Sequence, residues 1–152
     1  MVWPEDVLSI ILATVFGAVI GAERELSGKS AGLRTNLLIC LGAAVFTIIS
    51  KKMTADTEGS VTRIAAQIVT GVGFLGAGAI IQDRGGVHGL TTAATIWLVA
   101  SIGMACGAGF YQLALITTLI AIAALIGLAK LARPLERYCE KSKSNRIPKD
   151  ND

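Results

Sequence analysis

Residues that bind metals or act as nucleophiles are scarce in this chain of 152 residues. It has one histidine, His88, and three cysteines, which form no CxxC pair. Zinc sites, haem attachment and Cys–His nucleophiles each need several such residues at fixed spacing. The sequence therefore predicts neither an enzyme nor a cofactor, and it leaves any metal unassigned. We interpret the cysteines as small apolar residues, and we expect Cys40 and Cys106 to lie apart, near opposite ends of two helices.

Charge is also sparse, since 16% of the residues are charged, 53% are hydrophobic and the mean hydropathy is +0.62. Five apolar stretches approach the roughly 20 residues with which a helix spans a bilayer. They cover residues 4–22, 36–50, 61–82, 91–108 and 110–132. The sequence predicts an all-α, polytopic membrane helix bundle with five transmembrane helices, surrounded by the lipid bilayer and binding no nucleic acid. We expect one transmembrane domain over residues 1–133 and a basic cytoplasmic tail over residues 134–152.

The first apolar stretch has a cleavable signal peptide as its alternative interpretation. Residues 1–6 contain no Lys or Arg, and bulky Ile20 stands where a small residue would precede the cleavage site, so we expect a retained helix. Of the 14 Lys and Arg residues, 11 fall in the segments on one side of the predicted membrane and three on the other. Because cytoplasmic segments carry the excess of positive charge, this bias predicts an N-out/C-in topology.

The third stretch contains four glycines within eight residues: Gly71, Gly73, Gly76 and Gly78. They match a dinucleotide-binding fingerprint, but no strand precedes them and the next acid, Asp83, comes too soon for that motif. In a bilayer such glycines let neighbouring helices approach closely. Gly71 and Gly78 lie one heptad apart, with Gly73 and Gly76 roughly opposite, so we predict that the third helix lies in the middle of the bundle.

Two amides share the Gly71 face of this helix. Gln67 and Gln82 lie within about 40° of it at helical periodicity. Two interpretations stay open. The amides could form hydrogen bonds that hold neighbouring helices together, or they could form a row of polar groups beside a helix face that glycine leaves without side chains.

Three threonines, Thr91, Thr92 and Thr95, lie within about a 100° arc at the start of the fourth stretch. Thr91 or Thr92 is expected to cap that helix after the preceding loop. The free amides of a helix N-terminus also favour an anion, which makes this end a candidate binding site.

Charged residues border the first two stretches. Glu23, Arg24 and Glu25 close the first, and Arg34 directly precedes the second. Glu23 follows Gly17 and Gly21 on a stripe of small residues, so its carboxylate is a candidate for a buried ion pair with Arg34. The alternative is that both charges are interfacial anchors, and the sequence leaves the choice open.

Several motifs occur in order along the chain. They are Gly21-Ala-Glu23-Arg24, Ala31-Gly32-Leu33-Arg34-Thr35, Arg63-Ile-Ala65-Ala66-Gln67, the glycine run of residues 71–78, and Gly89-Leu90-Thr91-Thr92-Ala93-Ala94-Thr95-Ile96-Trp97. Over about residues 17–110 they resemble the transmembrane domain of the MgtC/SapB family of bacterial membrane proteins, in a SapB-like short form. The motif positions fall here on Glu23, Arg24, Arg34, Thr35, Arg63, Gln67, Gly71, Gly73, Gly76, Gly78, Thr91, Thr92 and Trp97.

The resemblance implies a multi-pass protein of the bacterial inner membrane, linked to magnesium homeostasis, virulence and stress survival. It implies a non-enzymatic regulator that acts on membrane-protein partners such as a proton-translocating ATP synthase. A transporter or channel for Mg²⁺ or another small ion is the alternative, with Glu23, Glu25 and Asp83 as candidate ligands near the inner face. A small-molecule or lipid sensor is a third possibility. We also expect a homo-oligomer, most simply a two-fold dimer.

Overall fold

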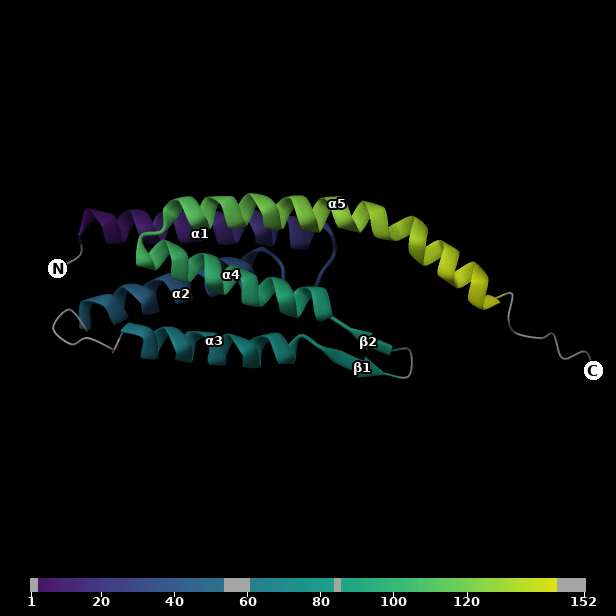
Figure 1. The fold of residues 1–152 in the computed structure, drawn as a ribbon, viewed down its shortest axis with the longest axis horizontal. Helices are drawn as coiled ribbons and strands as arrows, with labels where there is room; N and C mark the ends of the chain where they lie inside the picture. The colour runs from purple at the N-terminus through teal and green to yellow at the C-terminus, as the bar shows by residue number, and fades with distance from the viewer. Residues whose placement is uncertain (1–2, 54–60, 84–85, 145–152) are drawn as a thin grey trace, which may run out of the picture.

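The computed structural model describes the backbone of residues 3–53, 61–83 and 86–144, and the side chains of residues 3–53, 65–82 and 86–128. The described elements are α1 (Pro4–Leu26), α2 (Leu33–Met53), α3 (Val61–Gly78), β1 (Ile81–Asp83), β2 (Gly86–His88), α4 (Leu90–Ala108) and α5 (Tyr111–Ser144). Figure 1 shows the five helices lying along one direction, with α1 and α5 on one face, α2 and α4 in the middle, and α3 on the opposite face.

The predicted all-α bundle of five helices is confirmed. Among the described residues, four helices are long and apolar enough to cross a membrane: Pro4–Leu26, Leu33–Met53, Leu90–Ala108 and the Tyr111–Leu128 part of α5. The described apolar part of α3, Ala65–Gly78, is shorter than these four. The orientation in the membrane and the boundary between a spanning domain and a tail stay predictions, and α5 continues as a helix to Ser144.

The third helix ends earlier than the sequence predicted, at Gly78 instead of Gln82. The amides of Ala79 and Ile80 bond to carbonyls three residues back, both at 3.1 Å, which tightens the last turn. Strands β1 and β2 then form an antiparallel hairpin in which Gln82 pairs with Val87. We call the end of the bundle that carries this hairpin and the α1–α2 connection the hairpin end (Figure 1).

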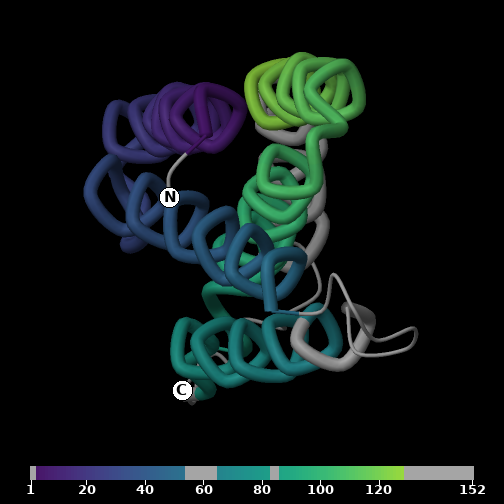
Figure 2. Tube along the Cα trace, turned by 90° about the vertical axis from the view of Figure 1, so that its left-hand side faces the viewer, coloured from purple at the N-terminus to yellow at the C-terminus, as the bar shows by residue number. Residues whose placement is uncertain are grey.

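Helix α4, not α3, is the central helix. It packs against α1, α2, α3 and α5, and the end-on view in Figure 2 shows those four helices around it. The prediction that α3 lies in the middle is therefore wrong. Its glycines could admit close neighbours, but a Cβ atom built on Gly71, Gly73 or Gly78 would meet nothing within 4 Å. Gly76 alone of the four approaches another helix, at 3.5 Å from the carbonyl oxygen of Ala93.

Close helix packing is instead made by two small-xxx-small motifs against α2. Gly17 and Gly21 of α1 lie against one side of α2, where a Cβ on Gly21 would meet the Cα of Leu33 at 2.8 Å. Gly103 and Gly107 of α4 lie against it from the other side. Four-residue spacing puts each pair on one helix face, which lets the backbones approach in a bilayer.

The main core is apolar and draws on four helices. Its buried residues are Ala13, Phe16, Ile20, Cys40, Ala44, Val99, Ile102, Cys106, Ala114 and Ala121. Cys40 and Cys106 belong to this one cluster, so the prediction that they lie apart is wrong. The reason is that α4 is shifted along α2, so that Gly103 in the last part of α4 lies against the backbone of Cys40 in the first part of α2.

Candidate functional site

The α1–α2 connection is held by a carboxylate and by backbone hydrogen bonds. Helix α1 ends with the amide of Ser27 bonding to the carbonyl oxygen of Glu23 at 2.9 Å, and Gly28 follows with a φ of 66°. Oε2 of Glu25 accepts a hydrogen bond of 2.7 Å from the amide of Leu33, the first residue of α2. A negative charge at the N-terminus of α2 complements the dipole of that helix. Glu25 therefore stabilises the start of α2.

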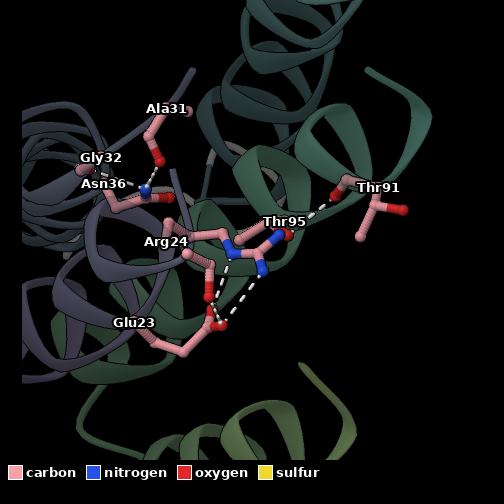
Figure 3. A network of polar contacts seen from close by, with 8 residues as sticks. Glu23, Arg24, Ala31, Gly32, Asn36, Thr91 and Thr95 are labelled. Atoms are coloured by element: carbon pink, nitrogen blue, oxygen red, sulfur yellow. Dashed lines mark hydrogen bonds and ion pairs between the residues drawn. The ribbon is translucent and has the colours of Figure 1, made fainter. Parts of the chain in front are cut away.

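Arg24 is buried at the hairpin end with its charge paired to the neighbouring glutamate. The Nε atom donates to Oε2 of Glu23 at 2.7 Å, and Nη2 donates to Oε1 at 3.1 Å. Ser27 donates its hydroxyl to the same carboxylate at 2.7 Å. The side chain of Arg24 is 3% exposed and that of Glu23 is 11% exposed. Figure 3 shows the guanidinium reaching from α1 toward Thr91 and Thr95 of α4.

The Glu23–Arg34 pair that the sequence suggested is not formed. Glu23 bonds to Arg24 and Ser27, while Arg34 is exposed to the surroundings. The bidentate contact with Arg24 uses both carboxylate oxygens, so the pair forms within α1 and not between α1 and α2.

Asn36 is a buried polar residue that the sequence analysis missed. Its side chain is fully buried and donates from Nδ2 to the carbonyl oxygens of Ala31 at 2.7 Å and Gly32 at 2.9 Å. It thus ties the connection to the first turn of α2 (Figure 3). The sequence did carry a signal for this residue, which is a lone amide at the start of an apolar stretch. An amide in a membrane helix needs hydrogen-bond partners in the protein.

We call the side chains of Glu23, Arg24 and Asn36 the Arg24 cluster (Figure 3). Two of its polar atoms have no hydrogen-bond partner among the described residues: Nη1 of Arg24 and Oδ1 of Asn36. Buried polar groups are usually satisfied by protein or water. Nη1 of Arg24 can donate to an anionic or carbonyl oxygen, and Oδ1 of Asn36 can accept a hydrogen bond from a hydroxyl or an amide. These two atoms therefore equip the site to bind a polar or anionic group through hydrogen bonds and charge.

The threonines lie beside this cluster, but neither Thr91 nor Thr92 caps α4. Helix α4 begins at Leu90 with Gly89 as its N-cap, at a φ of 87° and without a side-chain cap. A Cβ on Gly89 would lie 2.0 Å from the carbonyl oxygen of Ala79, so only glycine fits there. Thr92 and Thr95 are buried, and Thr95 donates its hydroxyl to the carbonyl oxygen of Thr91 at 2.8 Å.

Four of the remaining sequence candidates lie at exposed positions instead. Thr35, Gln67 and Gln82 are exposed, and Trp97 is 53% exposed. The side chains of Arg63 and Asp83 lie outside the described residues. The structure therefore brings together Glu23, Arg24, Thr91 and Thr95 from the sequence candidates and adds Asn36.

Within the described part of the chain, no group of three or more His, Cys, Asp and Glu side chains could hold a metal ion. Glu23 and Glu25, two of the three candidate Mg²⁺ ligands, are engaged by Arg24, Ser27 and Leu33. Mg²⁺ is usually held by one or two carboxylates with several waters, and these two carboxylates have protein partners instead.

Comparison with known proteins agrees with the sequence motifs. Residues 10–134 match the model of the MgtC family. The chain is 47% identical over 131 residues to Protein MgtC of Salmonella typhimurium strain LT2, which covers 86% of this chain and 55% of that protein. It is 49% identical over 115 residues to the Putative magnesium transporter YhiD of Escherichia coli strain K12, covering 72% of this chain and 54% of that protein.

The chain also matches the Uncharacterized protein slr0014 of Synechocystis at 42% identity over 138 residues, covering 91% of this chain and 56% of that protein. It spans about half the length of these curated relatives. No solved structure matches it. The resemblance drawn from the motifs is confirmed, and the chain belongs to the MgtC family of membrane proteins.

Proposed function

We propose that this protein is a non-enzymatic regulator in the bacterial inner membrane, which acts through contacts with other membrane proteins when magnesium is limiting. The observation that carries the proposal is the position of its buried charge. Arg24 and Glu23 lie at one end of the bundle, while the core between α1, α2, α4 and α5 is apolar. Ionisable residues in membrane helices mark functional sites by default.

The buried hydroxyls of the core do not supply a polar path within the described residues. Thr47 and Thr118 donate to carbonyl oxygens four residues back on their own helices, both at 2.7 Å. Ser9 bonds to Tyr111 at 2.9 Å and joins α1 to α5. These bonds satisfy each hydroxyl locally, which supports a rigid scaffold more than an ion pathway.

A proton-translocating ATP synthase is the partner class that family resemblance suggests, and we propose contact at the hairpin end. We also propose that the protein forms a two-fold dimer, because that symmetry is the commonest among homo-oligomers. Native mass spectrometry in several detergents measures the oligomeric state. A strictly monomeric particle in all of them would contradict the dimer.

Transport of Mg²⁺ or another small ion is the second candidate function. The name of the Escherichia coli relative, Putative magnesium transporter YhiD, favours it. A sensor for a small molecule or lipid is a third, favoured by the unpartnered Nη1 of Arg24 beside the start of α4.

An experiment in a bacterium that lacks its own member of the family distinguishes regulation from transport. The intact protein should alter growth at limiting magnesium without changing the initial rate of Mg²⁺ uptake. The variant Arg24→Gln, present in the membrane at the same amount, should lose the effect on growth. Lys29→Gln is the matched control, because Lys29 is an exposed cation in the nearby α1–α2 connection. A growth effect that follows the Mg²⁺ uptake rate would contradict regulation.

A further inference from the structure

An apolar groove of about 370 Å³ lies between α2 and α3, away from the Arg24 cluster. Every residue that lines it is apolar, and its walls include Leu38, Gly42 and Phe46 of α2 with Gly71 and Leu75 of α3. A Cβ on either Gly42 or Gly71 would meet nothing within 4 Å. The two glycines, one on each wall, therefore give the groove its depth.

The position of the groove limits what can fill it. It follows α2 from Leu38 to Phe46, about 12 Å at 1.5 Å per residue, inside a helix that is long and apolar enough to span a bilayer. When α2 spans a bilayer, this part of the helix is surrounded by hydrocarbon. A transmembrane helix is about 10–12 Å across with its side chains, so only side chains of a partner helix would enter, whereas a lipid acyl chain enters along its length.

One end of the groove carries Arg34, a cation without an ion pair among the residues that the structure describes. Arg34 and Thr35 each precede a lining residue, Leu38 and Ile39, by four positions, so they lie about one turn nearer the hairpin end. Both are exposed. Among the described residues, Arg34 makes no ion pair or hydrogen bond through its side chain. An arginine guanidinium binds phosphate through two parallel hydrogen bonds.

At the other end of α2, the two cations among the described residues, Lys51 and Lys52, are both engaged. Lys51 donates from Nζ to the carbonyl oxygen of Ala108 at 3.1 Å, which stabilises the C-terminus of α4. Lys52 pairs with Asp6. The groove is thus apolar along its length, and among the described residues the unengaged positive charge next to it is Arg34 at the hairpin end. This arrangement matches a phospholipid with a negatively charged headgroup.

We propose that the groove between α2 and α3 binds one acyl chain of an anionic phospholipid, with the lipid phosphate held by the guanidinium of Arg34 and the hydroxyl of Thr35. The site goes beyond the proposed regulation by partner contacts. It does not depend on which leaflet the hairpin end faces.

The test measures lipid binding to the purified full chain by native mass spectrometry and by thermal unfolding in neutral detergent. The probes are phosphatidylglycerol and phosphatidylcholine with identical acyl chains. The intact protein should retain phosphatidylglycerol preferentially and unfold at a higher temperature in its presence. Arg34→Gln should bind phosphatidylglycerol about tenfold more weakly, which is the loss of one charge-assisted contact. It should also lose the preference over phosphatidylcholine.

Filling the groove tests the acyl chain separately. Gly42→Leu and Gly71→Leu place a side chain in open space from opposite walls, so both should fold and both should lose bound lipid. Gly127→Leu and Lys29→Gln are the controls, since Gly127 of α5 also has nothing within 4 Å of its Cβ position and Lys29 is an exposed cation. Both controls should bind phosphatidylglycerol like the parent.

Three results would overturn the proposal. Parental lipid binding by both groove-filling variants would mean that the lipid is held elsewhere. Parental binding and preference in Arg34→Gln would remove the headgroup contact. Dissociation of a dimer by both Gly42→Leu and Gly71→Leu, with no lipid retained by the parent, would make a second copy of the chain the occupant.

Discussion

A Cβ atom built on Gly103 would lie 2.1 Å from the carbonyl oxygen of Cys40, so the backbones of α4 and α2 touch where no side chain fits. From α1, a Cβ on Gly17 would lie 2.7 Å from the Cβ of Cys40. Glycines of two neighbouring helices therefore pack against α2 at Cys40. These contacts fix α1, α2 and α4 relative to one another and position Arg24 and Asn36 at the hairpin end.

Gly103→Ala should be strongly destabilising, because the methyl group must displace backbone. Overpacking of a tight interior costs about 1–3 kcal/mol and sometimes more. Thermal unfolding in detergent measures the effect. Gly73→Ala is the control on α3, where a Cβ meets nothing within 4 Å, and it should be neutral or slightly stabilising. Equal stability of Gly103→Ala and the parent would show that the α2–α4 contact is looser than described.

The pairing of Glu23 with Arg24 predicts a coupled double-mutant cycle. Arg24→Gln alone leaves a largely buried carboxylate unpaired and should lower the free energy of unfolding by roughly 3–5 kcal/mol. Adding Glu23→Gln should recover part of that loss, with a coupling of about 0.5–3 kcal/mol. The same cycle with Arg34→Gln should be additive within about 0.5 kcal/mol. Coupling to Arg34 and not to Arg24 would restore the pair that the sequence suggested.

Asn36→Ala should destabilise the α1–α2 connection. The substitution removes two hydrogen bonds to the carbonyl oxygens of Ala31 and Gly32, each worth about 1 kcal/mol net. Thr35→Ala changes an exposed neighbour and should leave the unfolding temperature unchanged. If the two variants were equally stable, Asn36 would not hold the connection.

The skew of positive charge predicts that the chain ends in the cytoplasm. In a variant without native cysteines, Thr57→Cys should react with an impermeant thiol reagent added outside the cell, and Asn145→Cys should react only after lysis. The opposite labelling pattern would reverse the topology.

Sequence periodicity predicted the helices well because long apolar runs leave few alternatives in a bilayer. Residues 91–108 were expected as one helix, and α4 runs from Leu90 to Ala108. The hairpin was not expected, because two strands of three residues each leave no periodic signal. Glycine spacing shows that a second helix could approach closely, but it does not show that one does. For this reason α3 was wrongly placed in the middle of the bundle, and the Gly103–Gly107 pair of α4 was overlooked.

The site was predicted less well than the fold for a similar reason. The sequence offered a Glu23–Arg34 pair as one of two open alternatives, because Glu23 follows Gly17 and Gly21 on a stripe of small residues. Residues one position apart on a helix do not normally face each other, so helical spacing gave no signal for the contact of Glu23 with Arg24. Which arginine bends toward the carboxylate depends on the packing of α1 against α2 and α4, and that packing is not encoded in the spacing of charges.

The most direct test of the account is ion flux through the purified protein in proteoliposomes, followed with dyes for Mg²⁺ and for pH. If the protein regulates partners, both fluxes should equal those of protein-free vesicles, under an ion gradient and under a membrane potential. A saturable flux of Mg²⁺ or protons that Glu23→Gln abolishes, in a variant that remains folded, would contradict the account and make this protein a transporter.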